Sequence, residues 1–357
     1  MGLSGGTSGR INLYDLDLPA LQALLESWGE PSYRAEQVWT WLYVHLVDSF
    51  EAMTNLPKGL RETLAERATL DVLEVVDTSR TADGRTRKDL LRLRDGETIE
   101  AVLMRYETRR TACLSTQVGC ALGCPFCATG QMGFRRDLSS GEIVAQALHF
   151  ARRLKDQGEH LTNVVLMGMG EPLANYDNSL AAIRRLNHPD GFRLGQRHIT
   201  LSTVGLVPKI KELAQEGLQI TLAISLHAAT DELRDRLVPV NHRFGLQALF
   251  QACASYVERT GRRVSFEWAL IEGVNDTPEQ AHALADRLYG TPGRLLAHVN
   301  LIPLNPSPGY RGASATSEAM EAFTAVLDQR SVPYTIRVSR GAAIQAGCGQ
   351  LRQRGRA

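Results

Sequence analysis

The sequence lacks any run of apolar residues that approaches the ~18 needed for a membrane-spanning helix. Residues 1–10 are rich in glycine and serine and have no apolar core of a secretory signal peptide. Gly6 stands where an N-myristoylation motif requires Ser or Thr. The formal net charge is only +1, so a nucleic-acid partner would have to meet a local basic surface. We therefore expect a cytoplasmic protein without a membrane partner.

Cysteine is also scarce, with 6 in 357 residues, yet four of the six lie between positions 113 and 127. In a reducing compartment, such a group of thiols is interpreted first as metal ligands or catalytic groups. Cys253 lies apart, in the helically spaced apolar run 246–253. It is expected to be a buried, small hydrophobic residue.

The first part of the chain predicts a helical module followed by a small antiparallel sheet. Helical patterns follow Asp17, run through 35–42 and follow Pro57. Residues 70–105 change to strand-like alternation, with hairpin-type turns at 83–84 and 95–96. We expect residues 1–105 to form an N-terminal helical/β accessory domain.

Beyond Thr111, strand patterns alternate with helical patterns, the first of which opens with the capping box Ser139-x-x-Glu142. Strands are expected at 112–115, 163–167, 198–202, 219–225, 264–270 and 298–302, and a last strand-like run covers 333–338. Six such units predict an α/β fold, a partial (β/α)6 barrel formed by residues 106–357. Its functional groups should gather at the carboxyl ends of the strands.

The strongest motif is Cys120-x3-Cys124-x2-Cys127, directly after the first predicted barrel strand. Its short spacers let three thiolates surround one [4Fe–4S] cluster, which leaves one iron without a protein ligand. S-adenosyl-L-methionine (SAM) can chelate that iron, and one electron can then cleave its sulfonium. A structural zinc site with Cys113 as fourth ligand is the alternative. Zinc ligands more often form two separated pairs, but spacing alone leaves this alternative open.

A second group of residues falls where predicted strands end. The run 163–172 is a strand followed by a glycine turn and a carboxylate, Gly170-Glu171, which suits close backbone approach and an ammonium ligand. The remaining strand-end residues are Ser202, Ser225, Leu226, His227 and Asn305. Each alone is typical of a turn or a helix cap, but together they would line the rim where a cofactor binds.

Two thiols remain, Cys113 on the first barrel strand and Cys348 between two glycines after the last strand pattern. Flanking glycines suit a flexible or closely packed backbone around a thiol that must move. The alternative for Cys348 is an incidental surface cysteine.

At this point the chain resembles the RlmN/Cfr family of radical SAM RNA methyltransferases, over nearly its whole length. The segments that carry the resemblance are 50–57, 113–120, 168–172, 300–306 and 348–351. The resemblance implies that Cys120, Cys124 and Cys127 hold the cluster. It also implies SAM binding by Gly170, Glu171, Ser202, Ser225, Leu226, His227 and Asn305.

The reaction that the resemblance implies uses two SAM molecules per turnover and an S-methylcysteine intermediate at Cys348. Glu100 corresponds by motif position to the proton acceptor, and its spacing before Cys113 matches the family pattern. Cys113 corresponds to the resolving thiol, which releases the product through a transient disulfide with Cys348. Without the resemblance, Glu100 is an alternating strand residue that is expected to face solvent.

The implied substrate is carbon 2 of an adenosine in 23S rRNA, and in tRNA as well. The implied partners are these RNAs, gripped in part by the N-terminal domain, and an electron donor such as flavodoxin; a monomer is expected. Basic residues near the two cysteine loops are candidates for phosphate contacts: Arg109, Arg110, Arg135, Arg136, Arg352, Arg354 and Arg356. Where the family carries acidic residues before the last cysteine, Ala342 and Ala343 stand here, which puts the anchoring of that loop in question.

Two other functions stay open. A Cfr-like enzyme would methylate carbon 8 of the adenine, although the segment 53–56 and the spacing before Cys348 favour carbon 2. A non-catalytic, zinc-containing RNA-binding protein would use the same cysteines without chemistry.

Overall fold

A computed structural model describes residues 9–290, 295–337 and 341–352. One ten-stranded sheet organises them, in the order β14-β13-β12-β11-β10-β9-β6-β5-β4-β3. Its strands are β3 (Leu73–Arg80), β4 (Thr86–Leu93), β5 (Thr98–Arg105), β6 (Arg110–Cys113), β9 (Asn163–Leu166), β10 (Ile199–Thr203), β11 (Thr221–Ser225), β12 (Val264–Leu270), β13 (Ala297–Pro303) and β14 (Tyr334–Ile336). Because β14 and β3 lie at opposite edges of this order, the barrel is open.

Two short sheets accompany the large one, β1 (Ile11–Asn12) with β2 (Ala68–Thr69) and β7 (Gln117–Gly119) with β8 (Phe134–Asp137). The α-helices are α1 (Leu18–Ser27), α2 (Tyr33–Thr40), α3 (Lys58–Arg67), α4 (Ala128–Gln131), α5 (Ser140–Lys155), α6 (Tyr176–Asn187), α7 (Val207–Leu213), α8 (Asp231–Leu237), α9 (Leu246–Thr260), α10 (Pro278–Tyr289) and α11 (Ser317–Gln329). None of the helices in the described ranges is long and apolar enough to cross a membrane.

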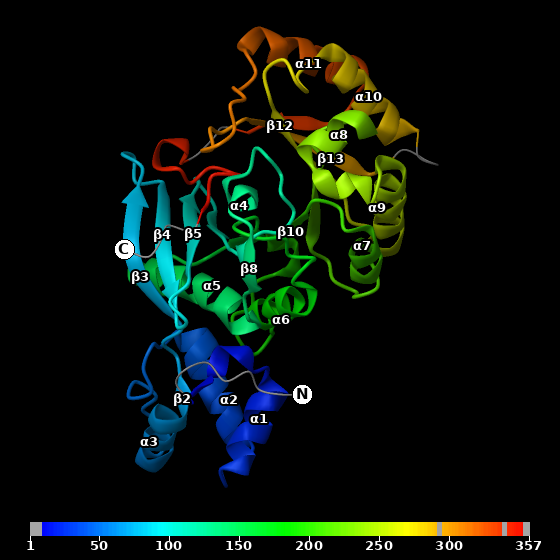
Figure 1. The fold of residues 1–357 in the computed structure, drawn as a ribbon. Helices are drawn as coiled ribbons and strands as arrows, with labels where there is room; N and C mark the ends of the chain where they lie inside the picture. Colours follow the sequence, from blue (N-terminus) through cyan, green and yellow to red (C-terminus); the bar gives the residue numbers. More distant parts are fainter. Residues whose placement is uncertain (1–8, 291–294, 338–340, 353–357) are drawn as a thin grey trace.

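Strand β6 and strands β9 to β14 pair in parallel and form the predicted α/β barrel, with helices such as α6, α7, α9 and α11 on its outer side (Figure 1). The six predicted strands correspond to β6 and β9–β13, and the run at 333–338 contains β14. Residues 338–340 lie outside the described part. Parallel pairing brings the carboxyl ends of these strands to one edge of the sheet, where the predicted site residues follow them.

The antiparallel strands β3, β4 and β5 are not a separate sheet, because β5 pairs with β6 of the barrel (Val102 opposite Cys113). Almost every residue of β4 and β5 is buried. Helix α5 covers one face, where His149 contacts Asp89, and the C-terminal segment covers the other, where Lys88 contacts Gln345. The large sheet therefore continues across the expected domain boundary at 105/106.

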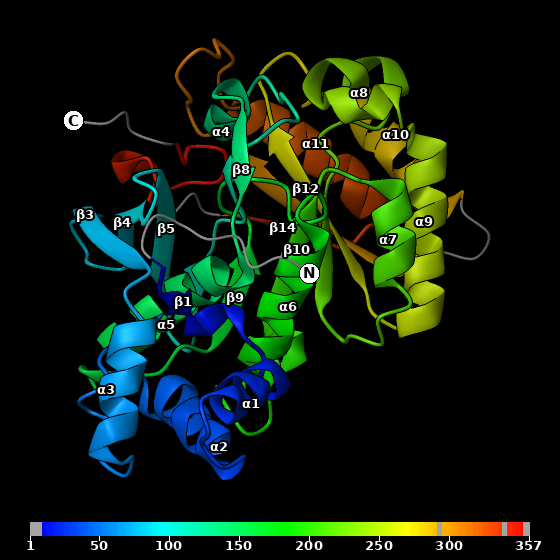
Figure 2. The same ribbon diagram turned by 60° about the horizontal axis from the view of Figure 1, so that its bottom comes forward.

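The N-terminal helices form a lobe below the barrel (Figures 1 and 2). The predicted capping groups are in place: the Asp17 carboxylate accepts from the Ala20 N–H, and Ser139 and Glu142 form a complete capping box. The lobe shares one hydrophobic core with the barrel. Cys253 is fully buried in α9, as predicted.

Two arginines of the barrel fasten this lobe through its backbone carbonyls. Arg185 of α6 donates to the Tyr14 and Asp15 carbonyls, and Arg152 of α5 donates to the Leu46 and Val47 carbonyls. The Arg185 side chain is buried, so water cannot replace these bonds if the guanidinium is lost.

We predict that Arg185→Met lowers the free energy of unfolding by about 2–3 kcal/mol, because it leaves buried carbonyls without donors. The neighbouring Arg184 offers a matched control, since its exposed guanidinium pairs only with Glu216 on the surface. Arg184→Met should change the stability by less than about 0.5 kcal/mol. Denaturant unfolding followed by circular dichroism measures both, and equal effects would contradict this account of the docking.

Candidate active site

A cavity opens at the carboxyl ends of the parallel strands, at the edge predicted from the sequence. It is lined by all three motif cysteines, by Cys348, and by six of the seven predicted SAM-binding residues: Gly170, Glu171, Ser202, Ser225, His227 and Asn305. The seventh, Leu226, has its side chain in the hydrophobic core and does not line the cavity. The structure thus brings together residues that lie up to 228 positions apart in the chain, from Cys120 to Cys348.

The cysteine loop begins after the short strand β7 rather than directly after the barrel strand β6. Strand β7 pairs with β8, and the Cys120 N–H donates to the Gly133 carbonyl at 2.9 Å. Gly119 has φ +76°, and a Cβ placed on it would lie 1.9 Å from the Gly133 oxygen. A glycine at 119 is therefore required for the hairpin that carries the three thiols.

The donor set fits a cluster with one open iron. Three thiols reach one cavity, and Cys113, which a zinc site would need as its fourth ligand, does not line it. Burial raises the pKa of the Cys120 thiol to about 12 and that of Cys124 further, so ligand binding must displace their protons. Within the described ranges, no three His, Cys, Asp or Glu side chains surround a single metal-ion position. That a [4Fe–4S] cluster fits this site is therefore inferred from the three cysteines that line the cavity and from the chemistry of their thiols.

Glu171 lies at the bottom of the glycine turn with its carboxylate aimed at the same cavity. Its two oxygens accept the N–H groups of Leu173, at 3.0 Å, and Val204, at 2.9 Å. Burial nevertheless raises the pKa of this carboxyl to about 7. The turn needs its glycines for packing: a Cβ at Gly168 would lie 2.6 Å from the Leu114 carbonyl oxygen, and Gly170 has φ +101°.

Arg234, which the sequence reasoning missed, organises the next two strand ends. Its fully buried guanidinium donates to the Val204, Ser225 and Leu226 carbonyls. Burial lowers the pKa of this group to about 10, so it remains charged at neutral pH. Arg234 lies on α8, seven residues past the predicted strand-end run 225–227. An arginine in a short polar helix is ordinary, so the sequence contained only a weak signal for this role.

His227 adopts a left-handed backbone conformation, with φ +60°. Its Nδ1 accepts the Ala269 N–H at 2.9 Å, and its ring meets Phe126 of the cysteine loop edge to face, with centroids 4.9 Å apart. Burial, aided by Arg234, lowers the pKa of the imidazole to about 3. The ring is therefore neutral and can donate through Nε2 toward the cavity.

Cys348 lies at the boundary between this cavity and a second one inside the barrel. Cys113, Met104 and Arg109 line the second cavity, and Cys348 and Asn305 line both. The exposed fraction of Cys348 thus faces the two cavities, while Cys113 is buried. Desolvation raises the pKa of the Cys348 thiol, and the nearby carboxylate of Glu267 raises it further.

The segment that carries Cys348 is anchored to the cysteine loop without any carboxylate at 342 or 343. Ala128 donates its N–H to the Gly349 carbonyl at 2.7 Å, and the Thr129 hydroxyl donates to the Leu351 carbonyl at 2.6 Å. In Figure 1 this C-terminal segment lies beside α4 and β5. Of its two glycines, Gly347 packs closely on the Asn305 side chain and Gly349 has φ +79°.

Glu100 does not face solvent, so that expectation was wrong. It is fully buried on β5, and its carboxylate lies 2.9 Å from the ammonium of Lys88. The alternating pattern failed because the C-terminal segment covers the face of β5 that would otherwise be solvated. Arg352 of this segment donates its backbone N–H to Glu100 at 3.0 Å.

The second residue that the sequence reasoning missed is Glu267 of β12, whose carboxylate side chain lines both cavities. It is buried and accepts hydrogen bonds from Ser265, at 2.9 Å, and Asn300, at 2.7 Å. In the sequence it is one polar residue in an apolar strand pattern, and that interruption was the signal that could have identified it.

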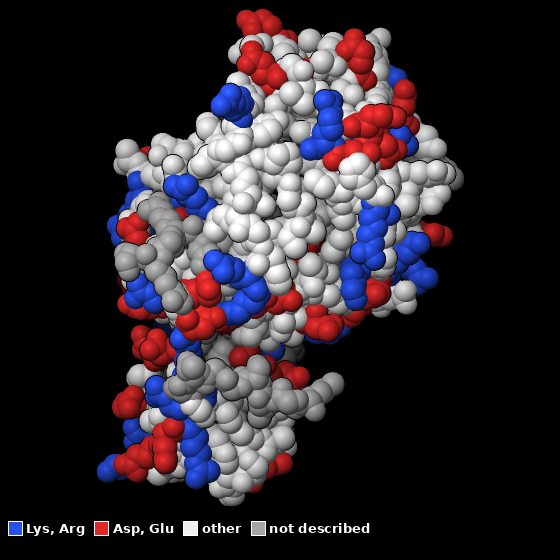
Figure 3. Space-filling model, in the orientation of Figure 1, with Lys and Arg blue, Asp and Glu red and all other residues white. Residues whose placement is uncertain are grey.

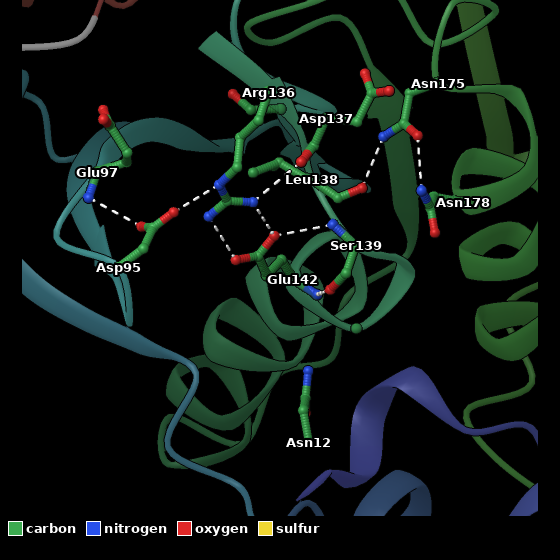
Figure 4. A network of polar contacts seen from close by, with 12 residues as sticks. Asn12, Asp95, Glu97, Arg136, Asp137, Leu138, Ser139, Glu142, Asn175 and Asn178 are labelled. Carbon is green, nitrogen blue, oxygen red and sulfur yellow. Dashed lines mark hydrogen bonds and ion pairs between the residues drawn. The ribbon is translucent and has the colours of Figure 1, made fainter. Parts of the chain in front are cut away.

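The arginines suggested for RNA contacts lie in different environments, and Arg352 is half-buried in the C-terminal segment. Arg136 is committed to ion pairs with Asp95, at 2.6 Å, and Glu142, at 2.8 Å, which tie β8 to the β4–β5 turn and to α5 (Figure 4). Arg110 pairs with Glu159. Arg135 is exposed, Arg109 lines the second cavity, and Arg354 and Arg356 lie outside the described residues.

On the face shown in Figure 3, Lys and Arg alternate with Asp and Glu around the periphery, and the middle carries few charges. No field of one sign covers this face. RNA binding there would depend on a few local cations and on shape.

Comparisons with known proteins agree with this geometry. Residues 11–70 match the family "Ribosomal RNA large subunit methyltransferase N-terminal domain", and residues 114–285 match "Radical SAM superfamily". The crystal structure of a radical SAM methyltransferase from Sphaerobacter thermophilus superimposes with a TM-score of 0.93 at 50% identity, covering 96% of this chain and 99% of that one.

The open barrel and its cysteine-lined cavity thus define an enzyme of the radical SAM superfamily, which uses a [4Fe–4S] cluster and SAM. Among curated proteins, "Dual-specificity RNA methyltransferase RlmN 1" of Myxococcus xanthus is 51% identical over 96% of this chain and 94% of its own length. "Probable dual-specificity RNA methyltransferase RlmN" of Dictyoglomus thermophilum is 46% identical over 96% of both chains. The chain belongs to the RlmN family.

The raised pKa of Glu171 predicts a pH dependence for SAM binding. Below about pH 7 the carboxyl is protonated and cannot neutralise an ammonium group, so affinity should rise about tenfold from about pH 6 to about pH 8. His227, with a pKa of about 3, does not titrate in this window. Equilibrium binding to cluster-loaded protein measures the effect. Glu171→Gln should bind weakly and with a flat profile, and an unchanged slope in that variant would contradict the assignment.

Proposed function

We propose that this protein methylates carbon 2 of an adenosine in RNA through an S-methylcysteine at Cys348. The observation that carries the proposal is the place of Cys348 between two cavities. One cavity contains the cluster cysteines with the SAM-binding residues, and the other contains Cys113. A thiol at that boundary can receive a methyl group on one side and deliver it on the other.

Cys120, Cys124 and Cys127 would hold the cluster, and Gly170, Glu171, Ser202, Ser225, Leu226, His227 and Asn305 would bind SAM. When bound, the cluster and SAM would together supply a radical able to take a hydrogen atom from the methyl group carried by Cys348. The scheme consumes two SAM molecules per turnover, because the methyl donor and the radical source are separate molecules. Leu226 contributes through its backbone, since its side chain is in the core.

Three side chains of the chain handle the bonds and protons. The Cys348 thiolate attacks the methyl carbon of the first SAM, and S-adenosylhomocysteine leaves with the electron pair of the broken bond. After the carbon has joined the adenine, Glu100 accepts the ring proton. The unpaired electron of the adduct would return to the bound cluster, so that a closed-shell thioether remains. Cys113 then attacks the Cys348 sulfur; a disulfide forms, the sulfur–carbon bond breaks, and its electrons stay on the carbon, which is protonated to a methyl group.

The substrates that we propose are 23S rRNA and tRNA, in keeping with the two relatives named dual-specificity RNA methyltransferases. We propose that residues 1–105 help to bind the RNA and that residues 106–357 catalyse the reaction. The continuity of β5 with β6 supports a rigid link between the two. We further propose a cytoplasmic monomer that receives electrons from a flavodoxin-like donor.

Replacing Cys113 should trap the reaction after the carbon has joined the RNA. We predict that Cys113→Ala protein, prepared anaerobically with its cluster, carries covalently linked RNA, because no thiol can resolve the adduct. Cys253→Ala removes a buried thiol that lines neither cavity, and this variant should carry none. Denaturing gels with and without ribonuclease detect the link. An adduct-free Cys113→Ala variant with an intact cluster would reject the scheme, as would an adduct in the double variant Cys113→Ala/Cys348→Ala.

The position of the new methyl group separates carbon 2 from carbon 8. We expect mass spectrometry of digested RNA to find 2-methyladenosine, because both curated relatives described above carry the RlmN name. RNA from cells that lack this enzyme provides the control. A product of 8-methyladenosine would assign the protein a Cfr-like reaction instead.

A further inference from the structure

A buried ion pair connects the proposed base to the segment that carries Cys348. Lys88 of β4 and Glu100 of β5 lie on one face of neighbouring strands, with Nζ and Oε1 2.9 Å apart. Only 3% of the lysine side chain and 1% of the glutamate side chain are exposed. A buried lysine is rare. A buried ion pair contributes little net stability, because desolvation opposes the attraction between its charges.

Both members of the pair also bind the backbone of the C-terminal segment. Lys88 donates to the Gln345 carbonyl at 3.0 Å, three residues before Cys348. The other oxygen of Glu100, Oε2, accepts the Arg352 N–H at 3.0 Å, four residues after Cys348. The pair therefore holds the Cys348 segment at both ends, and both oxygens of Glu100 are engaged while the segment is docked.

Resting on the function proposed above, we propose that Lys88 is a positioning residue that couples the docking of the Cys348 segment to the availability of Glu100. When the segment shifts with its adenine-bound carbon, the Arg352 N–H releases Oε2, which becomes the proton acceptor. Lys88 remains on Oε1 and keeps the carboxylate oriented. The ring proton passes to Oε2, and the electron pair of the carbon–hydrogen bond remains in the adenine ring. The unpaired electron of the adduct would return to the bound cluster.

In this role, Lys88 is needed for one step, the removal of the ring proton by Glu100. Methylation of Cys348 and formation of the RNA adduct precede proton removal. Without the lysine, the segment is still docked by the hydrogen bonds of Arg352 to Glu100, Ala128 to Gly349 and Thr129 to Leu351, so these two steps should not require Lys88. Without the lysine, Oε1 of the buried carboxylate loses its contact with the ammonium, and the carboxylate loses its orientation. A displacement of about 1 Å is enough to slow a proton transfer about 100-fold. Adduct should therefore accumulate even though Cys113 is present to resolve it.

The test compares Lys88→Met with Arg87→Met in the full-length, cluster-loaded protein with Cys113 intact. Arg87 is a matched control, because it forms an ion pair of similar burial with Asp89 on the opposite face of the same strand. The readouts are Cys348 methylation, 5′-deoxyadenosine, RNA-linked protein and released methyladenosine. We expect Lys88→Met to form the first two at near wild-type levels, to retain linked RNA, and to release product about 100-fold more slowly. Arg87→Met should retain no linked RNA.

Two results would overturn the proposal: product release from Lys88→Met at the wild-type rate, or an equal loss of all four readouts in both variants. If Lys88→Met does not fold, Lys88→Arg tests the proposal instead. The planar guanidinium of arginine keeps the positive charge but cannot keep the contacts with both Glu100 and the Gln345 carbonyl. It should show intermediate adduct, and release at the wild-type rate would overturn the proposal. Failure of the reaction scheme itself is distinguished by Cys113→Ala, which would then form no adduct whatever residue occupies position 88.

Discussion

The site depends on the docking of the C-terminal segment against the cysteine loop. Two hydrogen bonds, from the Ala128 N–H to the Gly349 carbonyl and from the Thr129 hydroxyl to the Leu351 carbonyl, place Cys348 beside the three motif cysteines. Neither segment could present this arrangement alone. Without these two bonds, the C-terminal segment would not hold Cys348 between the two cavities. Cys348 could then not pass a carbon from SAM to RNA in the proposed scheme.

Around this contact, the fold buries charge where the proposed chemistry needs it. Glu171 and Arg234 occupy water-excluded positions at neighbouring strand ends, where burial shifts the pKa of the first to about 7 and that of the second to about 10. Lys88 and Glu100 are buried as an ion pair between β4 and β5. Such groups are costly to desolvate, and their retention is better explained by the positioning of ligands and backbone than by stability.

Much of this could be predicted from the sequence because the relevant signals are local. The strand–helix alternation fixed β6 and β9–β13, and the spacing of Cys120, Cys124 and Cys127 indicated a cluster with an open iron. The polar residues after strands β9 to β13 were expected at one rim, because parallel strands share a direction. Six of those seven residues do line one cavity.

The errors have one physical origin, which is contact between distant segments. Glu100 was expected in solvent because the alternation of β5 says nothing about residues 345–352, which cover it. Arg136 was offered only as a candidate for a phosphate contact, and its ion pair with Asp95, 41 positions earlier, was not foreseen for the same reason. Arg234 and Glu267 were missed because a buried charge interrupts a hydrophobic pattern without showing which partner compensates for it.

The central claim is that the transferred carbon travels on Cys348, and isotope tracing tests it most directly. SAM with a labelled methyl group, incubated anaerobically with reduced enzyme and RNA, should label the peptide that contains Cys348 before label appears in adenosine. A chase with unlabelled SAM should then move that label from the peptide into the RNA. Labelled RNA formed while Cys348 stays unmethylated would contradict the account.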